Sequence, residues 1–349
     1  DRRPLVPGCW REVARRNLER GRTTMNIKLR VLVVGCGHMG KSHARAYHNL
    51  SSDFTIVGLV ARGPASRGKL NAELGGSYAE FADYYQALAQ TKPDVVCICT
   101  YVETHAPYAL AALEAGAHVF LEKPVADNLA DCERVIAAAR RRQRQLVVGY
   151  ILQVHPAWQK FTELARTLGK PLVMRMNLNQ QSSGAEWATH QNLLRSTSPI
   201  VDCGVHYVDV MCRMTESRPV SVNGIGARLS DEIALGQVNY GHLQVTFADG
   251  SVGWYEAGWG PMMSETAYFV KDVIGPSGSV SLVQDTQKSD DEAGHTKSDV
   301  LLKHHADLDD QGHWKHQDHR TIWEQTPDHQ GLCDLEQEYF YQAIVQDLD

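Results

Sequence analysis

LRVLVVGCGHMGKSH, residues 29–43, decides the fold of the front of the chain. A short valine-rich run is followed by glycines at positions 35, 37 and 40 and then by helix-compatible residues. Glycines in the pattern GxGxxG, with a strand before them and a helix after them, form a dinucleotide fingerprint. In this pattern Gly35 permits the tight turn, Gly37 lets the backbone approach a pyrophosphate, and Gly40 lets the helix pack on the strand.

The residues after Gly37 are expected to open that helix. The N–H groups of a helix N-terminus and its partial positive charge attract phosphate. We therefore predict that His38 and Met39 join the three glycines in binding a dinucleotide. The alternative is an ordinary strand–helix turn, because glycine-rich turns are common.

Apolar and amphipathic segments alternate from residue 28 to residue 149. Strands are predicted at FTIVGLV (54–60), PDVVCIC (93–99), AHVFLE (117–122) and QLVVG (145–149), and helices at 104–116 and 127–142. This alternation predicts an α/β domain with a parallel, doubly wound sheet. Ligands of such sheets bind at the carboxyl ends of the strands.

The end of the second predicted strand bears on the cofactor. NAD enzymes place Asp or Glu there to hold the ribose 2′-hydroxyl, but this chain has Ala61 and Arg62, with Arg67 shortly after. A guanidinium group suits a 2′-phosphate and stacks on adenine. We therefore predict that these residues bind NADP(H), with NAD(H) as the alternative. The competing interpretation is that both arginines are solvated loop residues.

Length and composition indicate a globular enzyme of two domains. The chain has 349 residues, of which 43% are hydrophobic and 22% charged, and no apolar run approaches the length of a membrane span. A net charge of -6 argues against a nucleic-acid partner. The eight cysteines are scattered, which indicates reduced thiols and a cytoplasmic location.

Both ends of the chain differ from the rest. Residues 1–27 are rich in arginine and are expected to be an extension outside the fold, with Met25 as the natural start. The last helical pattern stops abruptly, as in a truncated product.

Residues 150–349 are predicted to form a second, substrate-binding domain. A helix is expected at 156–168, a strand at 171–180 and further strands up to residue 283, with a hairpin turn at 248–250. The polar segment 284–330 is expected to be a solvated loop or an inserted hairpin. It holds seven of the sixteen histidines, whose irregular spacing argues against a metal site, so no metal is predicted.

SPIVDCGVHYVDVM (198–211) carries three ionisable groups on an otherwise apolar helical pattern. Ser198 suits the N-cap and the proline after it the first helical position. Asp202 and His206 are four residues apart and share a face, with Asp209 three residues further on. Alone, this stretch predicts a structural Asp–His pair.

Three motifs together, GCGHMGKSH (35–43), EKP (122–124) and DCGVHYVD (202–209), resemble the Gfo/Idh/MocA family of oxidoreductases. The resemblance extends over residues 28–283 and includes TYVETH (100–105) and GYILQVHPAW (149–158). It implies a Rossmann domain followed by an α+β domain with a large, open-faced, mainly antiparallel sheet. That sheet commonly forms oligomer contacts, so a homodimer or homotetramer is implied.

The resemblance also implies site residues. It places Lys123, Asp202 and His206 in catalysis: His206 accepts a proton, Lys123 binds the reacting oxygen, and Asp202 orients both. Further cofactor contacts are expected from Thr100, His105, Glu122 and Lys123, and substrate contacts from Tyr150, His155, Trp187, His190 and Asp209. Glu122 is open between orienting the nicotinamide and a local structural role. Glu186, Trp187 and His190 are assigned to a loop-like segment.

The function expected from these observations is NAD(P)-dependent hydride transfer to or from a hydroxyl or carbonyl group of a sugar, a polyol or a related small molecule. Two rivals stay open. One is a redox-neutral, NAD-dependent glycosidase of the same family, and the other is a non-catalytic dinucleotide sensor.

Overall fold

A computed structural model describes residues 27–264, 270–283, 300–322 and 326–348, and these divide into two compact units. The first unit runs to Ile151 and takes in the chain from His329 onward, and the second unit covers Leu152–Asp328. Nearly all of the predicted extension at 1–27 lies outside the described residues.

The first unit is built on a six-stranded sheet. Its order is β3-β2-β1-β4-β5-β6, and every neighbouring pair is parallel. The strands are β1 (Leu29–Val34), β2 (Phe54–Val60), β3 (Glu80–Phe81), β4 (Val95–Ile98), β5 (His118–Leu121) and β6 (Leu146–Val148). The predicted doubly wound α/β architecture is confirmed.

Both faces of this sheet are buried, which explains why most positions of its strands are apolar. In β1, Val31 and Val33 face one core cluster, and Leu32 and Val34 face the other. The helices are α2 (His38–Asn49), α3 (Pro64–Glu73), α4 (Tyr84–Thr91), α5 (His105–Glu114), α6 (Leu129–Arg142) and α11 (His329–Gln346), with the 3-10 turn η1 (Val102–Thr104). The core that contains Val31 and Val33 also holds Ala44 and Tyr47 of α2, and the core that contains Leu32 and Val34 holds side chains of α5 and α6.

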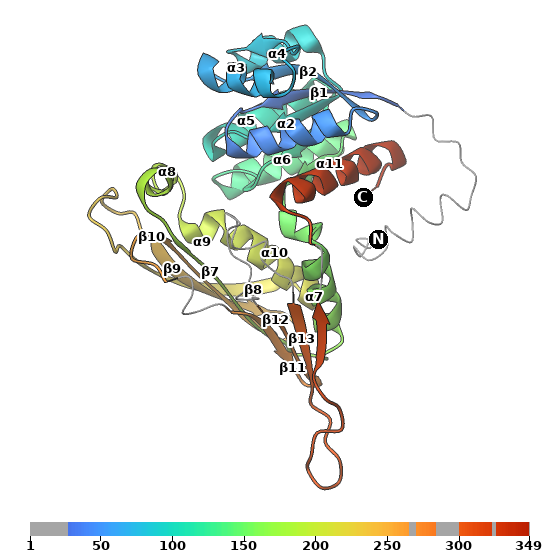
Figure 1. Cartoon of the computed structure of the whole chain (residues 1–349), viewed down its shortest axis with the longest axis vertical. Helices are drawn as coiled ribbons and strands as arrows, with labels where there is room; N and C mark the ends of the chain where they lie inside the picture. The colour runs from blue at the N-terminus through green and yellow to red at the C-terminus, as the bar shows by residue number, and fades with distance from the viewer. Residues whose placement is uncertain (1–26, 265–269, 284–299, 323–325, 349) are drawn as a thin grey trace, which may run out of the picture. The chain divides into compact units, whose positions relative to one another are not determined.

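The last helix, α11, belongs to the first unit. It packs beside α2 and contributes Phe340 and Tyr341 to the same core as Val31 and Val33 (Figure 1). From the sequence, the whole of 150–349 is predicted to belong to the second domain. A helical pattern shows that a helix exists, but it does not say which sheet buries its apolar face.

The second unit is built on an eight-stranded sheet of order β14-β13-β12-β11-β7-β10-β9-β8. Only β7 and β10 pair in parallel, so the predicted mainly antiparallel sheet is confirmed. The strands are β7 (Val173–Gln181), β8 (Pro219–Ala227), β9 (Tyr240–Phe247), β10 (Val252–Gly260), β11 (Lys271–Gly275), β12 (Gly278–Val283), β13 (Val300–His305) and β14 (His319–Ile322).

Two local predictions for this sheet can be compared with it. The turn at 248–250 joins β9 to β10, with Gly250 at φ +83°. Within the polar segment 284–330, the described residues contain β13 and β14, which pair as a hairpin. Residues 284–299 lie outside the described residues.

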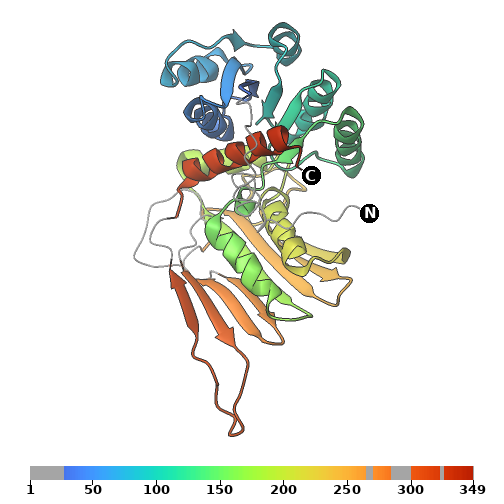
Figure 2. The ribbon, with the colours of Figure 1, turned by 90° about the vertical axis from the view of Figure 1, so that its right-hand side faces the viewer.

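Among the residues that the structure describes, helices cover one face of this sheet and leave the other open. The helical segments are η2 (Ile151–Gln153), α7 (Pro156–Arg166), α8 (Gly184–Leu193), α9 (Pro199–Asp202) and α10 (Gly204–Thr215). Helix α7 lies across β11, β12 and β13 (Figure 2), while α9 and α10 pack on β10. Along β7 the side chains alternate, with Met174 and Met176 buried and Val173 and Arg175 exposed.

The loop-like assignment of Glu186, Trp187 and His190 was wrong, because these residues lie on helix α8. The segment is mostly polar, and only Trp187 and His190 are buried, three residues apart on one face. Among the described residues, no helix combines the length and the apolar character that a membrane span needs.

Candidate functional site

The turn between β1 and α2 has the geometry of a dinucleotide fingerprint. Gly35 has φ +100°, and a Cβ there would lie 2.3 Å from the carbonyl oxygen of Cys99. A Cβ on Gly40 would lie 1.8 Å from the carbonyl oxygen of Gly35. A Cβ on Gly37 would meet nothing within 4 Å, so the backbone there is open to a ligand. Gly35 and Gly40 therefore have no room for a side chain and Gly37 has, a difference that suits a dinucleotide fingerprint.

Helix α2 begins at His38 with features that suit phosphate. Its N-cap, Gly37, makes no side-chain capping bond, and its first turn has no acidic residue. The N-terminal N–H groups and the helix dipole favour an anion at this position.

A cavity of about 510 Å³ opens beside the turn. It is lined by Cys36, Gly37, His38, Lys41, Ala65, Ser66 and Lys69. Two lysines and no carboxylate are among these residues, which favours an anionic ligand. Lys41 and Lys69 were not predicted from the sequence. Their signal is their position, one in the first turn of α2 and the other on the helix after β2.

The two predicted arginines at the end of β2 differ in their contacts. Arg67 donates to the carbonyl oxygen of Ala61 at 2.6 Å and to that of Arg62 at 3.3 Å. Its guanidinium also pairs with Glu80, with 3.3 Å from Nε to Oε2. Arg67 therefore ties the loop to its own backbone. The side chain of Arg62 is exposed.

His105 connects the loops that follow β4 and β5. Its Nε2 lies 2.9 Å from the carbonyl oxygen of Thr100, and its Nδ1 lies 2.7 Å from that of Pro124. The Thr104 hydroxyl donates to that of Thr100 at 2.7 Å. Thus His105 holds the EKP loop through its backbone.

Glu122, the first residue of the EKP loop, is enclosed in a buried network. Its Oε1 lies 2.8 Å from Nε2 of His43, and the Nδ1 of His43 lies 2.9 Å from Nε2 of Gln337 on α11. The other carboxylate oxygen of Glu122 accepts the backbone N–H of Lys123 at 3.2 Å. Of the two roles left open for Glu122, these contacts support the structural one.

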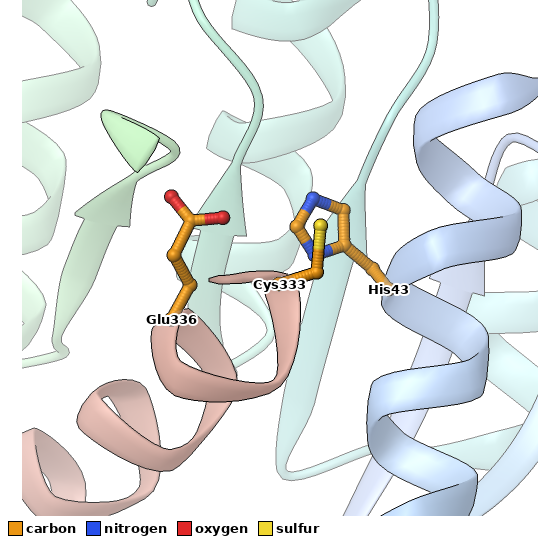
Figure 3. A group of neighbouring side chains, drawn as sticks. All are labelled: His43, Cys333 and Glu336. Atoms are coloured by element: carbon orange, nitrogen blue, oxygen red, sulfur yellow. The ribbon is translucent and has the colours of Figure 1, made fainter. Parts of the chain in front are cut away.

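A group that offers metal-ligand atoms lies in the same place. The ligand atoms of His43, Cys333 and Glu336 lie within 4.8 Å of one another, and all three residues are buried (Figure 3). Both ring nitrogens of His43 already have hydrogen-bond partners, Glu122 and Gln337. We therefore assign no metal to this group.

In the second unit, Asp202 ends α9 and His206 lies in the first turn of α10. Ser198 occupies the N-cap of α9 and Pro199 its first turn, as predicted, although Ser198 makes no side-chain capping bond. The predicted single helix is interrupted at Cys203. The Cys203 thiol lies 3.8 Å from Oδ2 of Asp202, and His206 is buried.

Two predicted substrate residues have structural partners. Both carboxylate oxygens of Asp209 lie 3.0 Å from Nε2 of Gln153. Burial raises the pKa of Asp209 despite the bond from Gln153. His155 is fully buried and caps α7 by accepting the Ala157 N–H at 3.2 Å. Tyr150, at the end of the first unit, is half-buried.

His190 belongs to a buried polar wall. Its ring stacks on Trp259, with 4.7 Å between centroids and 5° between planes, and its Nδ1 lies 2.8 Å from the Ser182 hydroxyl. The Trp259 indole donates to Gln180 at 2.7 Å. Burial lowers the pKa of His190, and Asp202 opposes the shift. His190 and Asp202 are thus close enough to interact.

Trp187 is held by an acidic partner, because its indole N–H donates to Oε2 of Glu232 at 2.7 Å. Sequence reasoning missed Lys271, which is buried on β11 with its amino group over the ring of Tyr207 at 5.3 Å. It donates to the backbone oxygen of Asn177, and burial lowers its pKa to about 7. A single lysine in an apolar strand gives no signal of this kind.

Two family descriptions match the chain. "Oxidoreductase family, NAD-binding Rossmann fold" matches residues 29–150, and "GFO/IDH/MocA C-terminal domain" matches residues 163–280. Together they cover more than half of the chain.

Curated relatives match at lower coverage. Inositol 2-dehydrogenase of Salmonella paratyphi B is 28% identical over 192 residues, which are 53% of this chain and 54% of the relative. UDP-N-acetylglucosamine 3-dehydrogenase of Acidithiobacillus ferrooxidans is 28% identical over 57% of this chain and 58% of the relative. The matches thus span little more than half the length of these relatives.

Solved structures share the whole fold. The Acidithiobacillus ferrooxidans UDP-N-acetylglucosamine 3-dehydrogenase has a TM-score of 0.70 at 21% identity, over 92% of this chain and 90% of that one. An oxidoreductase of Thermotoga maritima has a TM-score of 0.73 at 20% identity, over 92% and 89%. At these identities the likeness concerns the fold.

Proposed function

The chain belongs to the Gfo/Idh/MocA oxidoreductase family, and we propose that it transfers a hydride between NADP(H) and a hydroxyl or carbonyl group of a sugar, a polyol or a related small molecule. The observation that carries this proposal is the glycine turn before α2. Its backbone is open at Gly37 and closed at Gly35 and Gly40, as a pyrophosphate site requires. The names of the curated relatives, which are dehydrogenases of inositol and of a nucleotide sugar, support the substrate class.

The proposed chemistry uses one group from the first unit and two from the second. NADP(H), when bound, would supply the hydride-transfer chemistry. His206 accepts the hydroxyl proton, because an imidazole titrates near neutral pH. Lys123 donates a hydrogen bond to the reacting oxygen and stabilises its developing charge. Asp202, one turn before His206, tunes and orients these groups.

NADP(H) is proposed as the preferred cofactor. Ala61 stands where an acid would hold a ribose hydroxyl, and Arg62 beside it is exposed. The neighbouring cavity presents Lys41 and Lys69 without a carboxylate. Lys41 pairs with Glu73 at 3.9 Å, so Arg62 and Lys69 carry the positive charge that favours a 2′-phosphate.

The open face of the second sheet is proposed to join copies of the chain into a homodimer or homotetramer. Val173, Val252 and Ile274 lie opposite one another on neighbouring strands of this face, and each is more than a third exposed. Apolar side chains in such a row indicate a contact surface. We also propose a cytoplasmic location, since the seven described cysteines are free thiols.

A spectrophotometric screen tests the proposed activity. The purified chain is mixed with sugars, polyols and nucleotide sugars, with NAD or NADP, in both directions. A change in nicotinamide absorbance with at least one such alcohol, faster with NADP, is expected. If cofactor binds but no compound is oxidised or reduced, the sensor alternative holds; glycoside cleavage without added cofactor supports the glycosidase.

A further inference from the structure

A buried hydrogen-bond chain connects the last helix of the protein to the EKP loop. It runs from Gln337 on α11 through His43 on α2 to Glu122, with contacts of 2.9 Å and 2.8 Å. It ends where Glu122 accepts the backbone N–H of Lys123. Three elements that are distant in sequence therefore fix one loop residue.

The hydrogen-bond chain leaves the Glu122 side chain little room to move. Gln337 and His43 are fully buried, and Glu122 is 5% exposed. A Cβ on Gly149 would lie 3.2 Å from Oε1 of Glu122, so the backbone of Gly149 closes one side of the carboxylate. The carboxylate points into the protein and holds its own loop.

The charges on the chain are paired. Burial opposes the charge of His43, but the hydrogen bond to Glu122 and the nearby Cys97 and Glu336 raise its pKa to about 9. Burial likewise opposes the charge of Glu122, but His43, Lys123 and His105 lower its pKa. Glu122 is therefore a carboxylate at neutral pH, and Lys123 is close enough to interact with it.

We propose that His43 and Gln337 are positioning residues for Lys123. They hold the Glu122 carboxylate, which fixes the backbone of Lys123 and places a negative charge beside its side chain. This inference rests on the proposed role of Lys123 in hydride transfer. Helix α11 would then do more than cover the sheet of the first unit, because it supplies Gln337 to the hydrogen-bond chain.

The first test measures Lys123 without any substrate. In the full chain, the rate at which an acetylating reagent modifies Lys123 is followed by peptide mass spectrometry as a function of pH. Glu122→Gln is expected to move the midpoint to lower pH, because an opposite charge favours the protonated lysine. His43→Gln is expected to move it the same way, since an unpaired buried Glu122 takes up a proton. The double variant, which combines His43→Gln with Glu122→Gln, should move the midpoint no further than Glu122→Gln alone.

The matched control is Tyr47→Phe. It removes a buried hydroxyl of α2 that lies one turn after His43 and is not part of the hydrogen-bond chain. It is expected to leave the midpoint unchanged. If His43→Gln fails to fold, Gln337→Leu takes its place and should shift the midpoint in the same direction by less. Midpoints equal to wild type in both Glu122→Gln and Gln337→Leu overturn the inference, as does a fully additive double variant.

The second test is kinetic and uses an alcohol that the wild-type chain oxidises. His43→Gln and Gln337→Leu should lower kcat by about 10- to 100-fold, as expected for misplacement of a reacting group. KM and cofactor affinity should stay near the wild-type values, and Tyr47→Phe should keep its kcat. A change in KM alone contradicts the inference. Failure of wild-type turnover would instead contradict the proposed function, and the labelling result would still decide the role of the chain.

Discussion

At the scale of single residues, the positive side chains near the fingerprint are of two kinds: some are held by contacts within the protein, and others are free to contact the proposed cofactor. Arg67 is occupied by Ala61, Arg62 and Glu80, whereas Lys69 lines the cavity and Arg62 is exposed. The sequence places Arg62 and Arg67 in equivalent polar surroundings. Only the fold brings Glu80, on the neighbouring strand β3, to Arg67. Charge type could thus be predicted from the sequence, but not the partner.

This division predicts cofactor selectivity. Arg62→Ala and Lys69→Ala are each expected to raise the Kd of NADP(H) by about 10- to 100-fold, because a hydrogen bond to a charged group contributes about 1.5–3 kcal/mol. The Kd of NAD(H), measured by the same fluorescence titration, should change little. Arg67→Ala is the control: it should lower the unfolding temperature and weaken both cofactors alike. Equal losses for both cofactors in Arg62→Ala would refute a 2′-phosphate role.

At the scale of elements, the β1–turn–α2 unit was predictable because its glycines, apolar strand and helix agree with one another. The helices of the second unit were harder. SPIVDCGVHYVDVM predicted α10 through its helical spacing, but the interruption at Cys203 has no sequence signal. Helix α8 was missed because its polar residues dominate, although Trp187 and His190 lie one turn apart. A helix that buries only two side chains shows little hydrophobic periodicity in its sequence.

A pair of glycine variants tests the turn. Gly40→Ala places a Cβ 1.8 Å from the Gly35 carbonyl oxygen, so it should destabilise the first unit by about 1–3 kcal/mol and weaken cofactor binding. Gly37→Ala meets no neighbour within 4 Å, so it should keep wild-type stability and lose only cofactor affinity. Denaturant unfolding and cofactor titration separate the two effects. Equal stability of the two variants would contradict the assigned roles.

The apolar row on the open face of the second sheet predicts that copies of the protein associate through this face. Val252→Glu places a charge in the row formed with Val173 and Ile274 and should dissociate the proposed oligomer. Light scattering after size exclusion measures the mass of both forms. Ser52→Glu, in an exposed turn of the first unit, is a control for added charge away from the row. A monomeric wild-type chain would refute the proposed assembly.

At the scale of the whole molecule, each unit carries a buried group that titrates abnormally, and the two act in opposite directions. Burial raises the pKa of Glu336 in the first unit from 4.5 to about 8 and lowers that of Lys271 in the second from 10.5 to about 7. Between pH 4.5 and 8 the folded first unit retains a proton that the unfolded chain releases, so its stability falls as pH rises. Between pH 7 and 10.5 folded Lys271 has released a proton that the unfolded chain keeps, so stability of the second unit rises.

Unfolding measured across this pH range tests whether the stability of the first unit falls and that of the second unit rises with pH. Glu336→Gln should flatten the fall in stability of the first unit between pH 4.5 and 8, and Lys271→Met should flatten the rise for the second unit above pH 7. Hydrogen exchange read by mass spectrometry distinguishes peptides of the two units. An unchanged pH slope in either variant would contradict the burial assigned to that group.

We propose that Lys123 and His206 handle the proton while a hydride moves. The rate of nicotinamide reduction in Lys123→Met and in His206→Ala, measured with NADP and an alcohol that the wild-type chain oxidises, tests this proposal alongside the Kd of NADP(H). We expect each variant to lose roughly 10²–10⁴-fold in kcat, the range of general acid–base catalysis, while cofactor affinity stays close to wild type. Near-normal turnover in both variants would contradict it.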